Sequence, residues 1–543
     1  MVSMGSTQHN TPPWAYASIV VLLMLVAVCI WAPFSNITQN SNTPNTNERL
    51  FRMNIGTEPP TLDPTQMRDL VSHTVLNNTT HGLLLMDDKT GALKPALASH
   101  YEMSPDHRTY TFHIRPDAKW SDGQPLTAQD FIFALKRGLN KNEGAPYAFF
   151  LFYIQNAKRF YDGTLKEKDF SQVGIKAPNN KTLVFQLDKP VAFFDQLVAA
   201  PLFMPQREDI LKKFGDSATE AGHFVSTGPY QLSKWQHDNF IELTPNPHYY
   251  GAKPRFDRIK LFMIPEPNTS LIMYENKELD FAETASSLPS KEVRRIKKRD
   301  DYHFQTLHGI AYIGFNNQKP PVNNPLVRRA LAHAIDRQAF PKLFQSGEQP
   351  ISSWVSPGLL GYDKNIGLQF DPQKAQKLLA QAGYPDGKNF PKVEFWVAAT
   401  TPETAQSAEV IQAQWKKYLN INVAIRRVEW KVFLKQLDQD PPAIFRLQWY
   451  IDYPDADSYL TVFVTGSGNG NIKWNNKDYD KYVSLGAMTL NKTERQKYYD
   501  LAQRLLLEEH AAIIPLLVIP KSYLLKKELD GVSVSPLNHV TLH

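Results

Sequence analysis

Cysteine is almost missing from this sequence. Cys29 is the single cysteine among the 543 residues, so no intramolecular disulfide can form. Cys29 also lies in an apolar segment near the amino terminus. This excludes a thiol enzyme or a cysteine-ligated metal cluster in the body of the protein.

A long run of basic residues is also missing. The chain has 60 Lys and Arg against 54 Asp and Glu, a formal net charge of only +6, which gives no support to nucleic-acid binding. Apolar residues make up 42% and charged residues 21% of the chain, as in an ordinary globular protein. The length suffices for two or three domains with sizeable cores.

The sequence has one notable hydrophobic run, "ASIVVLLMLVAVCIWAPF" at residues 17–34. It is long enough for a signal-peptide core or a marginal membrane span. Val28 stands where a bacterial lipoprotein signal has a small residue, so three roles for Cys29 stay open: a lipidated anchor, an inert residue of a signal core, or part of an uncleaved span. A polar linker follows. We expect residues 1–48 to be a signal or anchor segment with its linker, and the body to be exported.

Catalytic signatures are not found. "TGSGNG" at 465–470 lacks the Lys-Ser or Lys-Thr of a phosphate loop, and we expect a flexible connection there. His73 and His81 have no carboxylate or cysteine at ligand spacing, so we expect structural or surface roles for both. No nucleophile elbow occurs. We therefore predict a protein that is not an enzyme and that holds no cofactor or metal.

Strand and helix patterns fill the rest of the chain. Residues 110–114 alternate as a half-buried strand does, and Thr127 with Asp130 predicts a capping box for a helix over 128–139. Cap-and-proline pairs predict two further helix starts, Asn324-Pro325 and Asp371-Pro372.

Strands and helices then alternate regularly. We expect strands at 393–398, 421–430 and 443–450, with helices at 403–419 and 431–438. This order predicts a mixed or parallel sheet and hence an α/β fold. Ligands of open sheets bind beyond the carboxyl ends of strands, and Asp452 falls just past such an end.

The stretch "AIFRLQWYIDYPDAD" (443–457) sets Arg446 and Asp452 on either side of Trp449 and Tyr450. Cores do not tolerate unpaired charge. In one interpretation the aspartate meets a cationic group of a ligand in an aromatic pocket, an attraction of about 5 kcal/mol gross at about 3 Å and an effective dielectric near 20, largely offset by desolvation. In the other, Arg446 pairs with Asp452 internally, or Asp452 caps the following loop. The local sequence leaves both open.

Five motifs in order carry a resemblance to a known family. They are "EPPTLDP", "GALKPALASHYEMSPDHRTYTFHIRPDAKWSDGQPLTAQDF", "STGPYQL", "GFNNQKPPVNNPLVRRALAHAIDR" and "DPQKAQKLLAQAGY". Together they resemble the extracytoplasmic solute-binding proteins of peptide-type ABC transporters, in particular oligopeptide-binding proteins and their murein-peptide-binding relatives. The match runs from about residue 50 to 540.

The resemblance implies a bilobal periplasmic binding protein-like fold, type II-like, with three domains and a hinge between lobes. Lobe I would comprise 49–82, 206–306 and 515–543. An extra domain would span 83–205, and lobe II would span 307–514.

The resemblance also implies a function. A monomer in the bacterial periplasm, released or tethered by residues 17–34, would bind oligopeptides and deliver them to the membrane permease of an ABC importer, with no role for nucleic acid. The alternatives are a murein peptide or metal chelate bound by the same fold and, from a different class, an exported peptidase.

The resemblance also implies ligand-binding residues, each at the position of this sequence that matches the family's motif. Asp452 would take the α-ammonium of the peptide, and Arg446 is the matching arginine. Trp449 and Trp430 would wall side-chain pockets, and Tyr450 completes the aromatic cluster.

Four positions depart from the family pattern. Gln448 replaces a glycine, and Arg68 replaces a glutamate that lines the site, so we expect Arg68 to hold a ligand carboxylate. Thr404 and Leu437 stand where some relatives place basic residues for the peptide carboxylate. The resemblance therefore leaves ligand length and carboxylate recognition open, and a ligand with a different terminus is compatible with these four positions.

Overall fold

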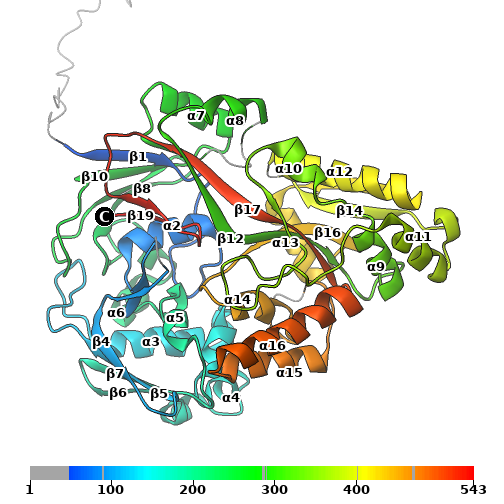
Figure 1. Cartoon of the computed structure of the whole chain (residues 1–543). Helices are drawn as coiled ribbons and strands as arrows, with labels where there is room; N and C mark the ends of the chain where they lie inside the picture. The colour runs from blue at the N-terminus through cyan, green and yellow to red at the C-terminus, as the bar shows by residue number, and fades with distance from the viewer. Residues whose placement is uncertain (1–47, 89–90, 284–287, 289, 400, 468–470) are drawn as a thin grey trace, which may run out of the picture. The chain divides into compact units, whose positions relative to one another are not determined.

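A sheet of eleven strands runs through the body of the protein in the computed structural model (Figure 1). Ten strands follow one path and β13 (Gln349–Pro350) pairs with β17 beside it. The path runs β15 (Val423–Val428), β14 (Val393–Ala398), β16 (Ile444–Tyr450), β12 (Tyr302–Phe315), β17 (Ile513–Leu525), β11 (Phe281–Glu283), β1 (Leu50–Asn54), β10 (Arg258–Phe262), β9 (Phe240–Pro245), β8 (Tyr230–Gln236).

The structure describes residues 48–543 apart from 89–90, 284–287, 289, 400 and 468–470. The apolar segment 17–34 with Cys29 lies outside the described residues, as does part of the glycine-rich connection at 465–470. Within the described part of the chain, no helix combines the length and the hydropathy needed to cross a bilayer.

Two long strands, β12 and β17, join the two halves of this sheet. They have 14 and 13 residues and pair antiparallel with each other. β12 pairs on its other side with β16, and β17 pairs on its other side with β11. The β12–β17 register shifts between Thr306 and Ile310 and again between Ala311 and Tyr312, and such irregularities bend a strand pair.

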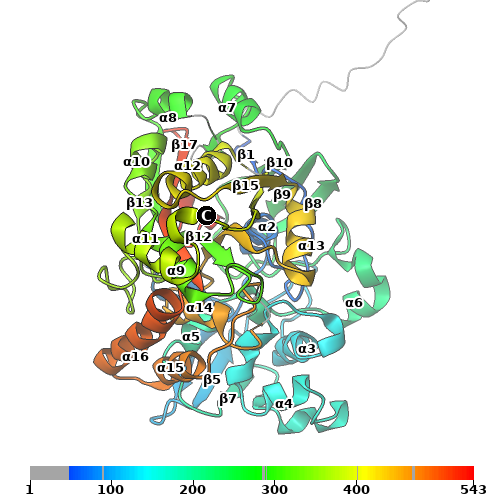
Figure 2. The same ribbon diagram turned by 90° about the vertical axis from the view of Figure 1, so that its right-hand side faces the viewer.

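Helices cover the end of the sheet that contains β14, β15 and β16. They are α9 (Pro325–His333), α10 (Ala339–Phe344), α11 (Pro372–Gln381), α12 (Pro402–Leu419) and α13 (Trp430–Gln439), and Figure 2 shows α9 to α12 gathered on one side. The expected caps are present, since the side chain of Asn324 accepts from the amide of Leu326 and that of Asp371 from the amide of Lys374, both at 2.9 Å. Three further helices lie between β16 and β17 in the chain: α14 (Asp457–Leu460), α15 (Lys477–Met488) and α16 (Lys492–Arg504).

The other end of the sheet carries fewer helices. α2 (Leu70–Thr79) begins at an aspartate cap, Asp69, and α7 (Pro267–Glu275) and α8 (Ser290–Ile296) flank β11. A small antiparallel pair, β18 (Val532–Val534) with β19 (Val540–Leu542), follows β17.

A separate antiparallel sheet lies within residues 83–205. Its order is β4 (Ala98–Met103), β5 (Thr109–Ile114), β7 (Thr182–Gln186), β6 (Ile175–Asn179), and β2 (Leu84–Met86) pairs with β3 (Leu93–Pro95) nearby. α3 (Ala128–Gly138) packs on it, with α4 (Ala157–Tyr161) and α5 (Phe194–Leu197) close by and α6 (Glu208–Phe214) following. The predicted capping box is confirmed, because the Asp130 carboxylate accepts from the amide of Thr127 at 2.7 Å.

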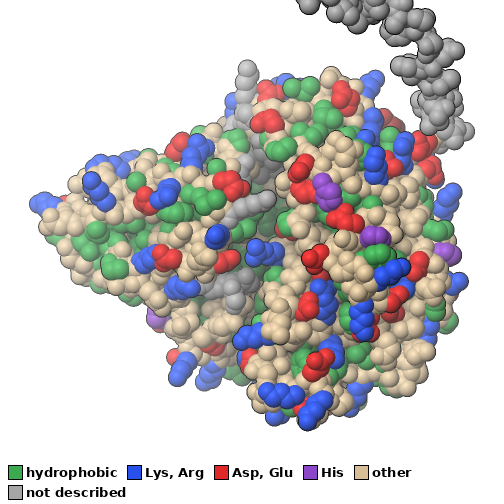
Figure 3. Space-filling view, turned by 180° about the vertical axis from the view of Figure 1, so that it is seen from behind, with side chains coloured by type: hydrophobic (Ala, Val, Ile, Leu, Met, Phe, Trp, Pro, Cys, Tyr) green, Lys and Arg blue, Asp and Glu red, His purple; other side chains and the backbone are tan. Residues whose placement is uncertain are grey.

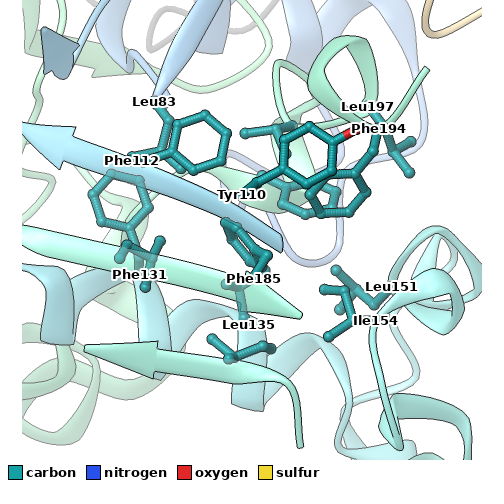
Figure 4. Packing of buried hydrophobic residues seen from close by; sticks show 14 of the residues in the cluster. Leu83, Tyr110, Phe112, Phe131, Leu135, Leu151, Ile154, Phe185, Phe194 and Leu197 are labelled. Carbon is teal, nitrogen blue, oxygen red and sulfur yellow. The ribbon is translucent and has the colours of Figure 1, made fainter. Parts of the chain in front are cut away.

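Buried aromatic side chains form the core of this smaller sheet. Phe112, Phe131 and Phe185 are fully buried there, and Tyr110 packs against Phe194 with ring centroids 4.9 Å apart (Figure 4). Lys and Arg side chains alternate with Asp and Glu over the surface shown in Figure 3, in keeping with the small net charge.

Candidate functional site

Strand β16 carries three of the predicted site residues. Successive side chains of a strand point to opposite faces, so Arg446 and Tyr450 share one face with Gln448 while Trp449 faces the other. Trp449 packs against one core cluster and Tyr450 against a different one. Trp449 and Tyr450 stay partly exposed, whereas Arg446 is buried.

Arg446 forms its ion pair with α12 and not with Asp452. Its Nη2 donates to Glu403 Oε1 at 2.7 Å, and its Nη1 donates to Thr404 Oγ1 at 3.4 Å. The Arg446 side chain is 2% exposed and the Glu403 side chain 11%, so each charge is buried and depends on the other. Internal pairing of Arg446 with Asp452, the first alternative from the sequence, is therefore wrong.

Ser458 ties Trp449 and Asp452 together. The indole Nε1 of Trp449 donates to the carbonyl oxygen of Ser458 at 3.0 Å, and the amide of Asp452 donates to its hydroxyl at 3.0 Å. These two bonds fix the indole and the backbone at the carboxyl end of β16 relative to each other.

The carboxylate of Asp452 has no protein partner among the described residues. Its Oδ2 is buried and accepts no hydrogen bond there, although the residue as a whole is partly exposed. Burial raises the pKa of this carboxyl to about 7. The loop-capping alternative is wrong as well, because no described backbone amide donates to this side chain. A buried acceptor without a donor is costly, so this oxygen suits a cationic ligand group.

The next two acids of the same segment have protein partners, although Asp457 Oδ1 is itself buried without a hydrogen bond among the described residues. Asp455 accepts twice from Arg495 Nη2, at 2.9 and 2.8 Å. Asp457 Oδ2 accepts from the hydroxyls of Tyr453 at 2.7 Å and Tyr153 at 3.0 Å, and burial raises the pKa of its carboxyl to about 7. The sequence did not indicate these roles, since Arg495 and Tyr153 lie far along the chain.

Tyr147 lies within electrostatic reach of charged residues from two parts of the chain, Arg68 and Asp69 before α2 and Asp452 after β16. Burial raises the pKa of its hydroxyl well above the usual value, and the negative charges of Asp452 and Asp69 raise it further, while Arg68 lowers it. These three charged groups therefore lie around one tyrosine. Tyr147 also stacks on Phe150 with centroids 5.2 Å apart.

Arg68 lies just before α2 and is exposed. Within the described ranges its guanidinium has no hydrogen bond or ion pair. Its neighbour Asp69 caps α2 through Oδ1, which accepts from the amide of Ser72 at 2.9 Å, and leaves Oδ2 buried without a partner. Asp69 is therefore a second candidate for binding a cationic ligand group. The sequence does not indicate this role, because an aspartate at this position resembles an ordinary helix cap.

Trp430 is the first residue of α13 and is 42% exposed. Its ring stacks on Phe433 with centroids 6.2 Å apart. Phe433 belongs to the core cluster against which Trp449 packs. Both tryptophans therefore border the same core cluster, and Trp430 keeps a large open surface.

The other three residues that depart from the family pattern, Thr404, Leu437 and Gln448, contact the protein itself. Thr404 is buried under Arg446, and Leu437 is fully buried in the core, so neither position offers a charge. The Gln448 side chain accepts a hydrogen bond from the Tyr450 hydroxyl at 3.4 Å.

His73 and His81 have the structural roles that we expect from the sequence. The His73 ring stacks on the His539 ring with centroids 3.9 Å apart. His81 Nδ1 forms a hydrogen bond with the Tyr250 hydroxyl at 2.8 Å.

A mixed α/β fold in which two long strands join the two halves of one sheet is the fold of the extracytoplasmic solute-binding proteins. The chain belongs to the bacterial extracellular solute-binding proteins, family 5, whose model for the middle region matches residues 92–471.

Known relatives cover nearly the whole chain. The oligopeptide-binding protein OppA of Bacillus subtilis is 30% identical over 531 residues, 96% of this chain and 96% of that protein. The structure of the Haemophilus influenzae OppA complex with the peptide RPPGFSPFR matches with a TM-score of 0.81 at 26% identity, covering 91% of this chain and 99% of that chain.

The murein tripeptide binding protein MppA of Escherichia coli is similar too. Its structure matches with a TM-score of 0.82 at 27% identity and covers 91% of this chain and 96% of that chain. The unliganded open form of MppA matches with a TM-score of only 0.67. Residues 49–543 are therefore arranged more like the first of these two MppA structures than like the unliganded open form.

Proposed function

We propose that this protein binds oligopeptides outside the cytoplasm and delivers them to an ABC importer in the bacterial inner membrane. The observation that carries the proposal is the Asp452 carboxylate, whose Oδ2 is buried without a partner among the described residues. A peptide α-ammonium supplies the missing donor and the opposite charge. The names of the relatives, which include oligopeptide-binding proteins, support this choice of ligand.

The aromatic residues take roles in side-chain recognition. We assign Trp449 and Trp430 to the walls of side-chain pockets, since both rings are partly exposed. Arg446 and Tyr450 form the wall on the opposite face of β16. Main-chain hydrogen bonds to an extended peptide do not depend on its sequence, and hydrated pockets adapt to many side chains.

The domain boundaries belong to the same proposal. We assign lobe I to 49–82, 206–306 and 515–543, an extra domain to 83–205, and lobe II to 307–514. The boundary at 306/307 then falls within β12, at the register shift between Thr306 and Ile310. The boundary at 514/515 falls within β17, opposite Tyr312 and Ile313 and beside the second register shift. Closure of the lobes over the peptide would bend these two strands.

The cellular setting completes the proposal. The chain would be exported, with residues 17–34 either removed or left as a tether, and would act as a monomer that docks onto a permease without catalysing a reaction. A murein peptide is the second candidate ligand, because the E. coli murein tripeptide binding protein has a similar structure. Such a peptide also presents an ammonium group to Asp452 when its amino terminus is free.

Isothermal titration of the purified protein tests the proposal after bound ligand has been removed by unfolding and refolding. We expect a pool of tripeptides to pentapeptides to bind, and the same pool acetylated at its amino termini not to bind. Asp452→Asn should lose at least about tenfold in affinity, equal to about 1.4 kcal/mol. Asp438→Asn, an exposed acid on α13, is the matched control and should bind as the parent does. Equal binding of both pools would remove Asp452 from its role, and no heat from either would contradict peptide binding.

Arg68 is assigned to a ligand carboxylate, because it is exposed near Tyr147 and has no partner among the described residues. Arg68→Ala should weaken acidic peptides by about 5- to 30-fold relative to neutral ones, the effect of one charge-assisted hydrogen bond of about 1–2 kcal/mol. Arg427→Ala, an exposed arginine on β15, is the control. An unchanged preference for acidic peptides in Arg68→Ala would disprove the assignment.

A further inference from the structure

Three potential metal ligands meet on the outer face of the β4–β5 hairpin, outside the site after β16. His100, Glu102 and His113 each offer one ligand atom, and these atoms all lie within 4.8 Å of one another. β4 and β5 are antiparallel and the register sets His100 opposite His113. Glu102 is two residues along β4 and so shares the face of His100. Neither the peptide proposal nor the relatives' names assign a role to this cluster.

A β-bulge directs His100 to this face. The register shifts between Ala98, which pairs with Ile114, and His100, so Ser99 is the extra residue. Ala98 is buried, and without the bulge His100 would point to the same side as Ala98. With the bulge, His100 is exposed and Tyr101 packs inward, with its ring 5.2 Å from that of Phe112.

The opposite face of the hairpin is held firmly in place. Phe112 and Tyr110 of β5 are buried among Phe131, Phe185 and other core side chains (Figure 4). Because side chains alternate along β5, the packing of Phe112 fixes His113 on the outer face.

Ser99 also sets the tautomer of His100. Its hydroxyl donates to the carbonyl oxygen of His113 at 3.1 Å and lies 3.0 Å from Nδ1 of His100. A hydroxyl has one proton, so with that proton directed at the carbonyl it accepts from Nδ1–H. His100 then has its lone pair on Nε2, and an outer partner on the second nitrogen is the usual arrangement of a metal-binding histidine.

His113 supplies the second unpartnered nitrogen. Its Nε2 is buried without a hydrogen bond among the described residues and lies 3.7 Å from Glu102 Oε1. The rings of His100 and His113 stack with centroids 4.3 Å apart. The rings are nearly parallel, 11° apart, so their in-plane lone pairs do not yet converge, although one ligand atom of each ring lies within 4.8 Å of a Glu102 carboxylate oxygen.

We propose that His100, Glu102 and His113 bind a divalent transition-metal ion of the Zn²⁺ class, with water completing the coordination. Two imidazoles and one carboxylate form a common ligand set for Zn²⁺, with metal–ligand distances of about 2.0–2.2 Å, whereas Mg²⁺ and Ca²⁺ prefer oxygen ligands alone. Ligand atoms of a tetrahedral Zn²⁺ lie about 3.3 Å apart. Binding therefore requires the exposed His100 ring to rotate out of its stack on His113, and Glu102 to follow, so that the ligand atoms converge on one ion.

Titration of Zn²⁺ into chelator-treated full-length protein without a histidine tag tests the site. We expect one Zn²⁺ per chain, bound in the presence of millimolar Mg²⁺, and a second titration with Co²⁺ should give the visible absorption bands of a bound ion. His100→Gln and His113→Gln should each weaken binding by at least about tenfold. His107→Asn, in the turn of the same hairpin, removes an imidazole outside the cluster and should leave binding unchanged.

Peptide titration and circular dichroism of each variant show that it is folded. Because the cluster lies on the outer face of a separate sheet, peptide affinity should not change in His100→Gln or His113→Gln, which separates this inference from the peptide proposal. Zn²⁺ binding that survives both histidine substitutions, or displacement of Zn²⁺ by Mg²⁺, would overturn the inference. If His113→Gln alone were unfolded, Glu102→Gln and His100→Gln at the exposed positions would still decide it.

Discussion

Asp452, Asp455 and Asp457 lie within one short segment and have three different surroundings. Arg495 neutralises Asp455, and two tyrosine hydroxyls donate to Asp457. Asp452 has neither kind of partner among the described residues. The same residue type therefore has protein partners at two positions, whereas at the third, Asp452, we propose that a ligand supplies the partner.

The pKa of about 7 for Asp452 predicts opposite effects of pH on binding and stability. An ammonium ligand needs the ionised carboxylate, so affinity for peptides with a free amino terminus should fall about tenfold per pH unit below pH 7. A carboxyl whose pKa is raised by folding lowers the free energy of unfolding above that pKa, and this cost disappears as the pH falls towards the unfolded value of 3.8. Asp452→Asn should therefore stabilise the ligand-free protein at pH 8 while it weakens binding.

Thermal melting and peptide titration between pH 5 and pH 8 measure the two effects on the same samples. Asp438→Asn should keep the pH dependence of the parent protein. A parent whose peptide affinity is constant from pH 8 to pH 5 would contradict the assignment of Asp452 to the ammonium group.

At the scale of elements, Tyr450 depends on a glycine in the neighbouring strand. Gly309 of β12 lies opposite Tyr450 in β16. A Cβ atom at Gly309 would come within 2.6 Å of the Tyr450 ring and 3.3 Å of Ile519. The close approach of β12 and β16 at the site thus requires glycine at this position.

Gly309→Ala should lower the free energy of unfolding by about 1–3 kcal/mol, the usual cost of overpacking, and should weaken peptide binding by moving Tyr450. Urea denaturation monitored by circular dichroism measures the first effect, and titration the second. Gly82→Ala is the matched control, because a Cβ there meets nothing closer than 3.8 Å. A Gly309→Ala protein as stable as the Gly82→Ala protein would disprove the packing argument.

Much of the element structure could be predicted from the sequence, because its signals are local. The strands at 110–114, 393–398 and 443–450 and the helices begun by Asn324 and Asp371 occur within a few residues of their expected bounds. The fold class followed from the order of these elements together with the family resemblance.

The partners in the site could not be predicted, since they come from distant segments. Glu403, which pairs with Arg446, is 43 residues away, and Tyr153 is 304 residues from Asp457. His113 meets His100 only through the bulged hairpin register. Local patterns contain no information on such contacts.

At the scale of the whole body, residues 49–543, aromatic and polar contacts join the extra domain to lobe II as we assign them. The Tyr153 hydroxyl donates to Asp457 at 3.0 Å. Phe193 stacks on Tyr453 with centroids 5.2 Å apart and lies under the guanidinium of Arg495. Because Tyr453 and Asp457 lie within five residues of Asp452 in the sequence, we expect these contacts to couple the position of the extra domain to the site.

Tyr153→Phe tests this coupling, because it removes one hydrogen bond to the buried Asp457. Loss of about 1 kcal/mol should raise the peptide dissociation constant about fivefold, and small-angle scattering should show a larger radius of gyration at subsaturating peptide. Tyr161→Phe, whose hydroxyl has no partner within the described residues, is the control. Unchanged affinity and scattering in Tyr153→Phe would show that this contact does not contribute to the bound state.

The sheet order has a consequence for biosynthesis and export. β11 lies between β1, from the start of the body, and β17, from its end. A growing chain emerges from the ribosome amino terminus first, so β11 and β12 wait for their shared neighbour until β17 has been made. The separate sheet of residues 83–205 does not depend on β17, but a chain on its way through a secretion channel keeps its central sheet open until β17 arrives.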